Sequence, residues 1–154
     1  MLMSFFVRLM FVFVLAGFNC HEAKQHAASN SIITAPIILS PAHPLACLPY
    51  PLQALNPAPE QLSFSVDHIV NPGLDPVSIA VYLRNGSEKK PVGLFSLYPS
   101  NKPANFVTRI NTVIDSARKN WLKKDWPAAQ LCFELQGLKN IKDQKMSVEV
   151  VGVH

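Results

Sequence analysis

From Leu62 onward, apolar and polar side chains alternate with a period of two. Leu62, Phe64 and Val66 share one face of a predicted strand, and the serine residues between them share the other face. This alternation is typical of strands in an antiparallel sheet that has one buried face. It recurs further along the chain, where it predicts strands over 77–84, 92–98, 131–135 and 146–153.

Turn-forming residues separate these predicted strands. The sequence NPGLDP at 71–76 contains two prolines and a glycine, so neither neighbouring strand can continue through it. Asn85-Gly86 follows the second strand, and this pair tolerates the positive φ of a hairpin turn. Asn85-Gly86-Ser87 is also an N-glycosylation acceptor sequence, although the turn alone already explains why Asn-Gly occurs here.

One segment has a helical period instead. Residues 112–124 carry an apolar stripe made of Val113, Ile114, Ala117, Trp121 and Leu122. Asn111 is a candidate N-cap, and Pro127 prevents the helix from extending further. One helix among five or six strands predicts a mainly β fold over residues 61–154, a single antiparallel β-sandwich with one short crossover α-helix. The pattern excludes a βαβ enzyme, in which helices would recur.

The first twenty residues, MLMSFFVRLMFVFVLAGFNC, form a predicted signal peptide. A lone Arg8 precedes a continuous apolar run from Leu9 to Phe18, which is too short to cross a bilayer of roughly 30 Å as a helix. We therefore expect a secreted or periplasmic protein. Two alternatives stay open, lipidation of Cys20 and retention of the segment as an anchor, and only these predict attachment to a membrane.

Residues 21–60 form a predicted proline-rich arm. The arm holds seven of the thirteen prolines and, after Lys24, no charged side chain before Glu60. Because proline fixes φ and lacks an N–H donor, this arm cannot form a regular helix or a central strand. Its apolar clusters, among them Ile37 to Leu39 and Leu45 to Leu48, do not suit a fully solvated linker. We expect part of the arm to lie along the domain or to cover a sheet edge.

The chain has three cysteines, Cys20, Cys47 and Cys132. If Cys20 leaves with the signal peptide or is lipidated, an even pair remains in an oxidising compartment. Cys47 and Cys132 are then a candidate disulfide. Cys132 lies on the strand face opposite Leu131 and Phe133, so the bond would hold the arm across a face or an edge of the sandwich. The alternative is two free thiols, with Cys132 simply buried.

Charge and motifs argue against several classes of function. The formal charge of +4 includes Arg8, so the chain without its signal peptide is only slightly basic. Its cations are interleaved with acids and form no concentrated stripe for nucleic acid. The sequence contains no GxSxG, HExxH or CxxC motif and no phosphate-binding glycine loop. Asp67 and Glu149 could meet across a sheet, but such a pair alone does not specify a glycosidase. We expect no enzyme activity.

The five histidines predict no metal or cofactor site. His21 and His26 lie near the expected mature N-terminus, where a free amino group followed by histidine can bind copper loosely. Terminal histidines more often have no ligand. His68 continues the alternating face of the first predicted strand, which favours a hydrogen-bonded sheet histidine over a ligand or an acid–base catalyst. His43, in the arm, and His154, the last residue, are expected to be exposed.

The order of these segments resembles a known domain. The matching sequences are VYLRN at 81–85, PVGLFSLYP at 91–99, NFVTRINTVIDSARKNW at 105–121, LCFELQG at 131–137 and MSVEVVGV at 146–153. They follow one another as in the C-terminal β-sandwich domain attached to the dicopper catalytic domain of tyrosinase and polyphenol-oxidase-like proteins. The resemblance covers Leu62 to Val153 and rests on core alternation and on Gly93.

The resemblance implies a fold and an accessory role, and it carries over no catalytic residue. In that family, six histidines on a helix bundle hold two copper ions, because several imidazoles must coordinate each copper from different sides. This chain has five histidines and no predicted helix bundle, so it cannot be the oxidase. In the family the extra domain packs on the catalytic domain, which suggests that a separate copy would serve a protein partner.

Two hypotheses of function follow from the sequence. The first is an exported, non-catalytic module that binds a protein partner, an oxidase-like one by the resemblance, through a sheet face and the proline-rich arm. The second is a periplasmic small-ligand or copper carrier. A carrier needs an apolar concavity with a few converging polar groups, whereas an interaction module presents a flat or convex patch.

Overall fold

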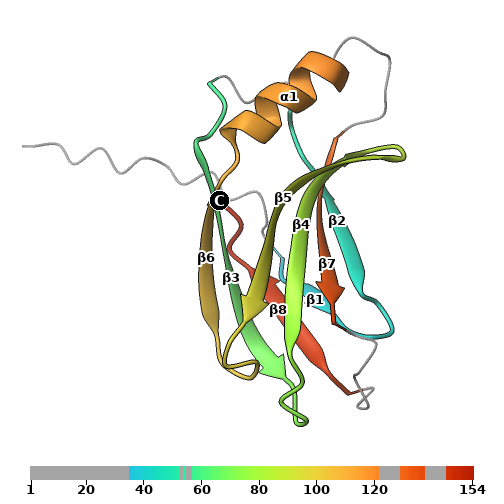
Figure 1. Ribbon diagram of the computed structural model, residues 1–154, viewed down its shortest axis with the longest axis vertical. Helices are drawn as coiled ribbons and strands as arrows, with labels where there is room; N and C mark the ends of the chain where they lie inside the picture. The colour runs from blue at the N-terminus through green and yellow to red at the C-terminus, as the bar shows by residue number, and fades with distance from the viewer. Residues whose placement is uncertain (1–34, 53, 55–56, 122–128, 138–144) are drawn as a thin grey trace, which may run out of the picture.

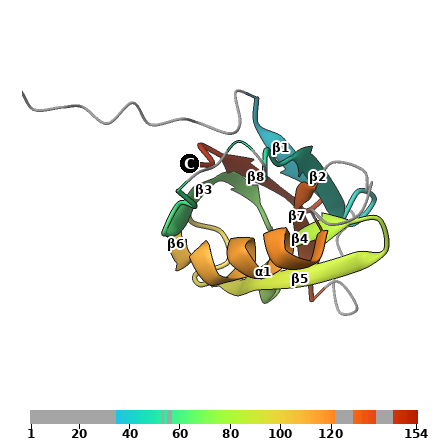
Figure 2. The ribbon, with the colours of Figure 1, turned by 90° about the horizontal axis from the view of Figure 1, so that it is seen from above.

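The computed structural model describes residues 35–52, 54, 57–121, 129–137 and 145–154. These residues form two four-stranded antiparallel sheets that pack face to face, which confirms the predicted β-sandwich (Figure 1, Figure 2). Sheet A contains, from edge to edge, β1 (Ile37–Leu39), β8 (Ser147–Val151), β3 (Gln61–Val70) and β6 (Ala104–Arg109). Sheet B contains β2 (Leu45–Pro49), β7 (Gln130–Gln136), β4 (Val77–Asn85) and β5 (Glu88–Leu97).

The core lies between the sheets and follows the predicted alternation. From sheet A, β3 buries Leu62, Phe64 and Val66, while Ser63 and Ser65 face outward. From sheet B, the buried residues are Val77, Ile79, Val81 and Leu83 of β4 and Leu131, Phe133 and Leu135 of β7. Burying one such side chain contributes about 1.5 to 3 kcal/mol. A one-residue slip of any of these three strands would expose its whole buried set, so the alternation fixes the register.

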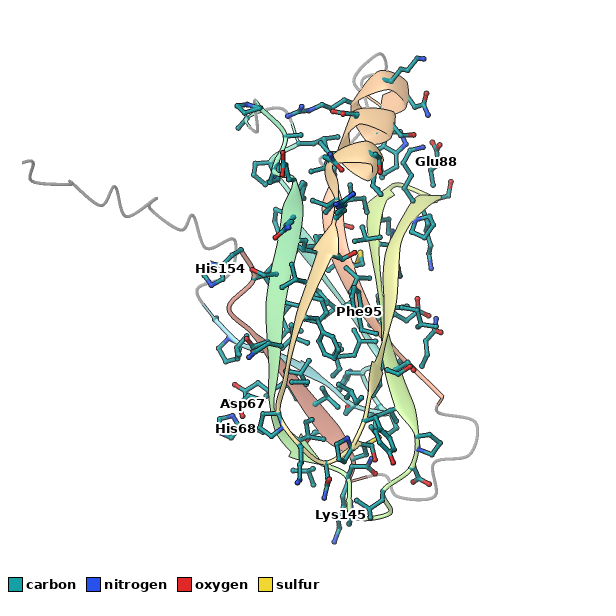
Figure 3. All side chains as sticks on the ribbon, turned by 60° about the vertical axis from the view of Figure 1, so that its left-hand side comes forward. Asp67, His68, Glu88, Phe95, Lys145 and His154 are labelled. Carbon is teal, nitrogen blue, oxygen red and sulfur yellow. A yellow bond between two sulfur atoms is a disulfide. The ribbon has the colours of Figure 1, made fainter. Side chains whose placement is uncertain are left out.

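Four phenylalanine rings fill the core on the side of β5 and β6. The centroid of the Phe64 ring lies 5.1 Å from that of Phe95, 5.2 Å from Phe106 and 5.4 Å from Phe133. Figure 3 shows Phe95 pointing between the two sheets. Gly93 leaves the space that this ring occupies, because a Cβ at Gly93 would lie 2.7 Å from Cζ of Phe95. A larger residue at position 93 would therefore force the Phe95 ring to move.

The proline-rich arm supplies an edge strand to each sheet. Among the described residues, β1 pairs only with β8, and β2 pairs only with β7. An edge position suits a proline-rich segment. Half of the N–H groups of an edge strand have no partner in the sheet, so a proline such as Pro49, which has no N–H group, can occupy such a position. Residues 37–39 and 45–49 of the arm are therefore themselves edge strands of the two sheets.

A disulfide fixes the arm to sheet B. Cys47 of β2 and Cys132 of β7 lie directly opposite each other, with their Cα atoms 4.0 Å apart and their sulfur atoms bonded. The predicted pair is confirmed, and it joins positions separated by 85 residues of sequence. Such bonds persist in oxidising compartments.

Helix α1 (Asn111–Trp121) crosses from sheet A to sheet B and lies over one end of the sandwich (Figure 1). Ile114, Ala117 and Trp121 face the core, as the apolar stripe predicts. The predicted N-cap is one residue off: the carbonyl oxygen of Ile110 accepts the first helical hydrogen bond, from the N–H of Ile114 at 2.9 Å, so Asn111 is the first helical residue. The Asn111 side chain accepts a hydrogen bond from the N–H of Thr112 at 2.9 Å. The predicted end of the helix at 122–124 lies outside the described residues.

The other end of α1 is tied to the arm. The Arg118 Nε donates a hydrogen bond to the carbonyl oxygen of Leu52 at 3.1 Å. The neighbouring Tyr50 donates its N–H to the Ala129 carbonyl oxygen at 2.7 Å. The helix, the arm and the start of β7 therefore hold one another in place. No helix among the described residues is long and apolar enough to cross a membrane.

Two strands differ from the predictions. β5 begins at Glu88 rather than at Val92, because the hairpin turn contains only Gly86, with φ of +59°, and Ser87. The charged residues after this turn continue the strand along a sheet edge. β6 is not predicted at all, because its inward positions include the small Ala104 while its outward positions include the apolar Val107, and this blurs the alternation.

Candidate interaction surface

Two loops meet at the end of the sandwich opposite α1 (Figure 1). Residues 71–76 join β3 to β4, and residues 98–103 join β5 to β6. The buried Asn71 side chain links them, because its Nδ2 donates to the carbonyl oxygen of Asp75 at 2.8 Å and to that of Ser100 at 3.1 Å. Its Oδ1 accepts the N–H of Asp75 at 3.2 Å. One side chain therefore fixes both loops relative to each other.

Three apolar side chains at these loops extend into solvent, and we name them the apolar loop tip. They are Val70 at the end of β3, Leu74 and Tyr98, and their exposed fractions are 49%, 60% and 95%. Contiguous apolar patches on a protein surface are typical of protein-binding sites, in whose buried centres tyrosine is enriched. The apolar loop tip is therefore the candidate functional site.

The backbone at Leu74 supports this assignment. Leu74 has φ of +51°, in the left-handed region. There its Cβ crowds the following carbonyl oxygen, at a cost of about 1 to 2 kcal/mol. The Leu74 N–H donates to the Asn71 carbonyl oxygen at 3.1 Å, so the turn holds this conformation. Glycine or asparagine would satisfy the turn with less strain, so an exposed leucine here points to a role beyond folding.

A polar group lies on the outer face of sheet A. The alternation places His68 on the inward face of β3, and this is wrong. A β-bulge between Asp67 and Val70 shifts the register, gives His68 φ of +44° and turns its side chain outward (Figure 3). The His68 Nδ1 lies 2.8 Å from the Glu149 Oε2, so the prediction of a satisfied sheet histidine is confirmed on the opposite face.

Asp67 and Glu149 are direct partners in the register of β3 and β8. Both already contact His68, because Asp67 Oδ1 accepts its backbone N–H at 2.8 Å and Glu149 pairs with its ring. These contacts stabilise the bulge. Among the described residues, no group of three or more His, Cys, Asp or Glu side chains is arranged to hold a metal ion.

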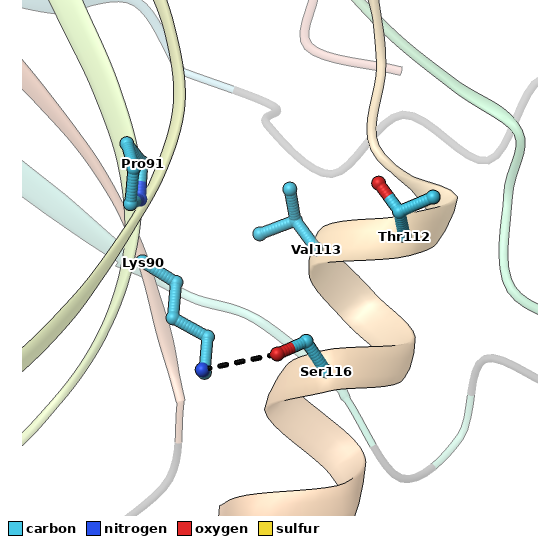
Figure 4. A pocket seen from close by; sticks show the side chains of 5 residues that line it. All are labelled: Lys90, Pro91, Thr112, Val113 and Ser116. Atoms are coloured by element: carbon cyan, nitrogen blue, oxygen red, sulfur yellow. Dashed lines mark hydrogen bonds between the residues drawn. The ribbon is translucent and has the colours of Figure 1, made fainter.

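Two depressions open to solvent lie around α1. The first, of about 240 Å³, is lined by Lys90, Pro91, Thr112, Val113 and Ser116 (Figure 4). Lys90 Nζ donates to Ser116 Oγ across it at 3.1 Å. The second, of about 400 Å³, is lined by Glu60, Gln61, Arg109, Asn111 and Thr112. Neither resembles the enclosed apolar concavity that a small-ligand carrier needs.

Polar atoms are also buried where α1 meets the arm. The Tyr50 hydroxyl, Arg118 Nη2 and Trp121 Nε1 have no hydrogen-bond partner in the part of the chain that the structure describes. Burial raises the pKa of Tyr50 to about 12, although the positive charge of Arg118 opposes the shift. None of the three residues lines either depression, so we assign them to the packing of the helix.

The outer face of sheet B buries a tyrosine under a lysine. The Lys89 Nζ lies 4.4 Å from the centroid of the Tyr82 ring and 3.7 Å from Glu134 Oε2. Its interaction with Tyr82, and then with Glu134, raises the pKa of Lys89. Asn85, at the end of β4, is only 4% exposed, so the hairpin turn explains Asn-Gly better than glycosylation does.

The remaining candidate residues do not form a site in the described chain. His43 and His154 are exposed, as expected. Cys20, His21 and His26, which carry the lipidation and copper alternatives, lie outside the described residues. The apolar loop tip is not predicted from the sequence; its one signal there is an apolar residue inside a turn sequence, Leu74 in NPGLDP.

Comparison with known proteins identifies no family for this chain. No protein-family model matches it, and no curated protein matches it. The assignment of function therefore depends on the chemistry of the surface itself.

Proposed function

We propose that this chain is an exported, non-catalytic β-sandwich that binds a protein partner through the apolar loop tip. The observation that carries the proposal is Leu74, an exposed leucine that the turn holds at φ of +51°. It lies on the loop that Asn71 ties to the loop of Tyr98. A strained, exposed leucine on a fixed loop is explained if a partner buries it.

The loop tip has the properties of a binding anchor. Tyr98 offers a large ring with a hydroxyl at its end, and such side chains contribute much of the energy at the centre of protein interfaces. The Asn71 hydrogen bonds hold the loops before binding, so less conformational entropy is lost on association. The partner surface that fits is an apolar groove with a polar group for the Tyr98 hydroxyl.

Other features support export and an accessory role. The apolar run before Cys20 and the Cys47–Cys132 disulfide both suit a secreted or periplasmic protein. The resemblance to the C-terminal domain of tyrosinase-like proteins favours an oxidase-like partner.

The test is recovery of the partner with matched variants. The mature protein is purified from its native compartment as wild type and as Leu74→Asp/Tyr98→Asp. Aspartate tolerates positive φ, so the variant should keep its fold. We expect a protein to co-purify with the wild type in a fixed ratio, and its recovery to fall at least about tenfold with the variant, because two anchors are lost.

Ile38→Asp is the matched control. Ile38 is 64% exposed on β1 and is not part of the apolar loop tip, so the same chemical change there should leave recovery unchanged. The proposal fails if no protein co-purifies with the wild type, or if Leu74→Asp/Tyr98→Asp recovers as much partner as Ile38→Asp does. Circular dichroism and the melting temperature of each variant confirm that the fold is retained.

A further inference from the structure

The four edge strands of the sandwich differ in how they are protected against pairing with another chain. β1 has only three residues. β2 ends at Pro49 and is held by the disulfide, and β5 carries Lys89, Lys90 and Pro91. Short length, proline and lysine are the usual devices that keep an edge strand from pairing. β6 has six residues, ANFVTR, with no proline and no lysine among them.

The backbone of β6 presents a regular row of free groups. Ile110 donates its N–H to Glu60 O, and Ser63 exchanges both hydrogen bonds with His154 on the other side of β3. In an antiparallel ladder the direction of the backbone groups alternates from residue to residue. The N–H and C=O groups of Asn105, Val107 and Arg109 therefore point away from β3, and no hydrogen bond joins them to the described residues.

The side chains of β6 are self-complementary about Val107. Val107 is 61% exposed on the outer face of sheet A and has the polar residues Asn105 and Arg109 on either side. If a second β6 runs antiparallel beside the first, with the two-fold axis at Val107, each Val107 faces its own copy. Each Arg109 then faces an Asn105, so no like charges are opposed. Such a two-fold contact closes on itself and ends at a dimer.

We propose that β6 is a dimer interface, at which two copies of this chain join their A sheets edge to edge. Each of the three facing pairs exchanges both of its N–H···O hydrogen bonds. Figure 2 shows β6 on the outside of the molecule, with no described element beyond it. The four strands of sheet A continue directly into the four strands of its copy.

This dimer would change how the proposed binding site is displayed. Because the two β6 strands run in opposite directions, the two copies of the apolar loop tip lie at opposite ends of the assembly. The dimer would then bind two partner molecules at once. The self-pairing of β6 does not depend on the proposed function, because Val107 is not part of the apolar loop tip.

Charge pairing at Val107 tests both the interface and its register. Wild type, Val107→Lys and Val107→Glu are measured separately by sedimentation equilibrium over a range of concentrations, and the two variants are then mixed. We expect the wild type to form dimers. Each variant alone should dissociate at least about tenfold more readily, since like charges face each other across the two-fold axis. The mixture should recover the dimer, because lysine then faces glutamate.

Ile38→Lys is the control, because Ile38 has a similar exposed fraction on β1, the opposite edge of the same sheet. It should leave the dimer intact. A wild type that stays monomeric at every concentration overturns the proposal, and so does a dimer that survives Val107→Lys or dissociates with Ile38→Lys. If the protein stays monomeric and β6 instead binds unrelated extended peptides, this edge pairs with a strand of another protein, and that result also overturns self-pairing.

Discussion

At the scale of single residues, Tyr50 shows how a buried polar atom makes stability depend on pH. Its pKa is about 12 in the folded protein and 10.0 in its unperturbed state. Between these values the unfolded chain releases the phenol proton first. The free energy of unfolding therefore falls as the pH rises through this window, and below it the full stability is present.

Tyr50→Phe removes both the titration and a buried hydroxyl that has no partner among the described residues. The variant should be at least as stable as the wild type at neutral pH, since no hydrogen bond is lost. Above pH 10 it should become progressively more stable than the wild type. Urea unfolding across this pH range measures the difference. Tyr98→Phe, which removes an exposed hydroxyl, is the control, and an equal pH dependence in wild type and Tyr50→Phe would contradict the assignment.

At the scale of elements, the strands with clear alternation could be predicted from sequence, and those without it could not. Leu62, Phe64 and Val66 predict β3 because their inward positions are strongly apolar. β6 is not predicted from the sequence, because its outward-facing Val107 is more apolar than its inward-facing Ala104 and the alternation is lost. The face of His68 was predicted wrongly because of a β-bulge. The bulge depends on how β3 pairs with β8, and the sequence of β3 alone does not show this pairing.

The apolar loop tip was not predicted for a related reason. The sequence NPGLDP marks a turn, but it does not show that Asn71 reaches across to the loop after β5. That contact joins positions 29 residues apart in the sequence, so only the assembled sandwich creates it. The disulfide could be predicted, because cysteine count and compartment limit the pairs without any knowledge of the fold.

The hydrogen bonds of the Asn71 side chain should couple the stability of the two loops. Asn71→Ala removes three hydrogen bonds and leaves buried backbone groups unpaired, so the free energy of unfolding should fall by about 3 kcal/mol. Denaturant unfolding measures the loss, and hydrogen exchange should speed up in both loops together. Asn101→Ala, at an exposed position of the second loop, is the control. Faster exchange in only one loop would show that Asn71 does not join them.

At the scale of the whole molecule, the disulfide limits the freedom of the unfolded chain. It joins positions separated by 85 residues, and the loop-closure argument gives a stabilisation of about 4.6 kcal/mol for such a span. Cys47→Ala/Cys132→Ala should lower the free energy of unfolding by that amount, as measured in guanidinium chloride. Reduced wild-type protein should match the variant. An unfolding midpoint unchanged by both treatments would show that β2 is held by its other contacts.

The pairing of β1 with β8 also determines when the protein can fold. These strands lie near opposite ends of the described chain. In the same way, β2 cannot pair until β7 has been synthesised. While the ribosome is still making the last strands, β1 has no neighbour in its sheet and the phenylalanine core lacks Phe133. Sheet A can therefore close only after synthesis has reached residues 147–151.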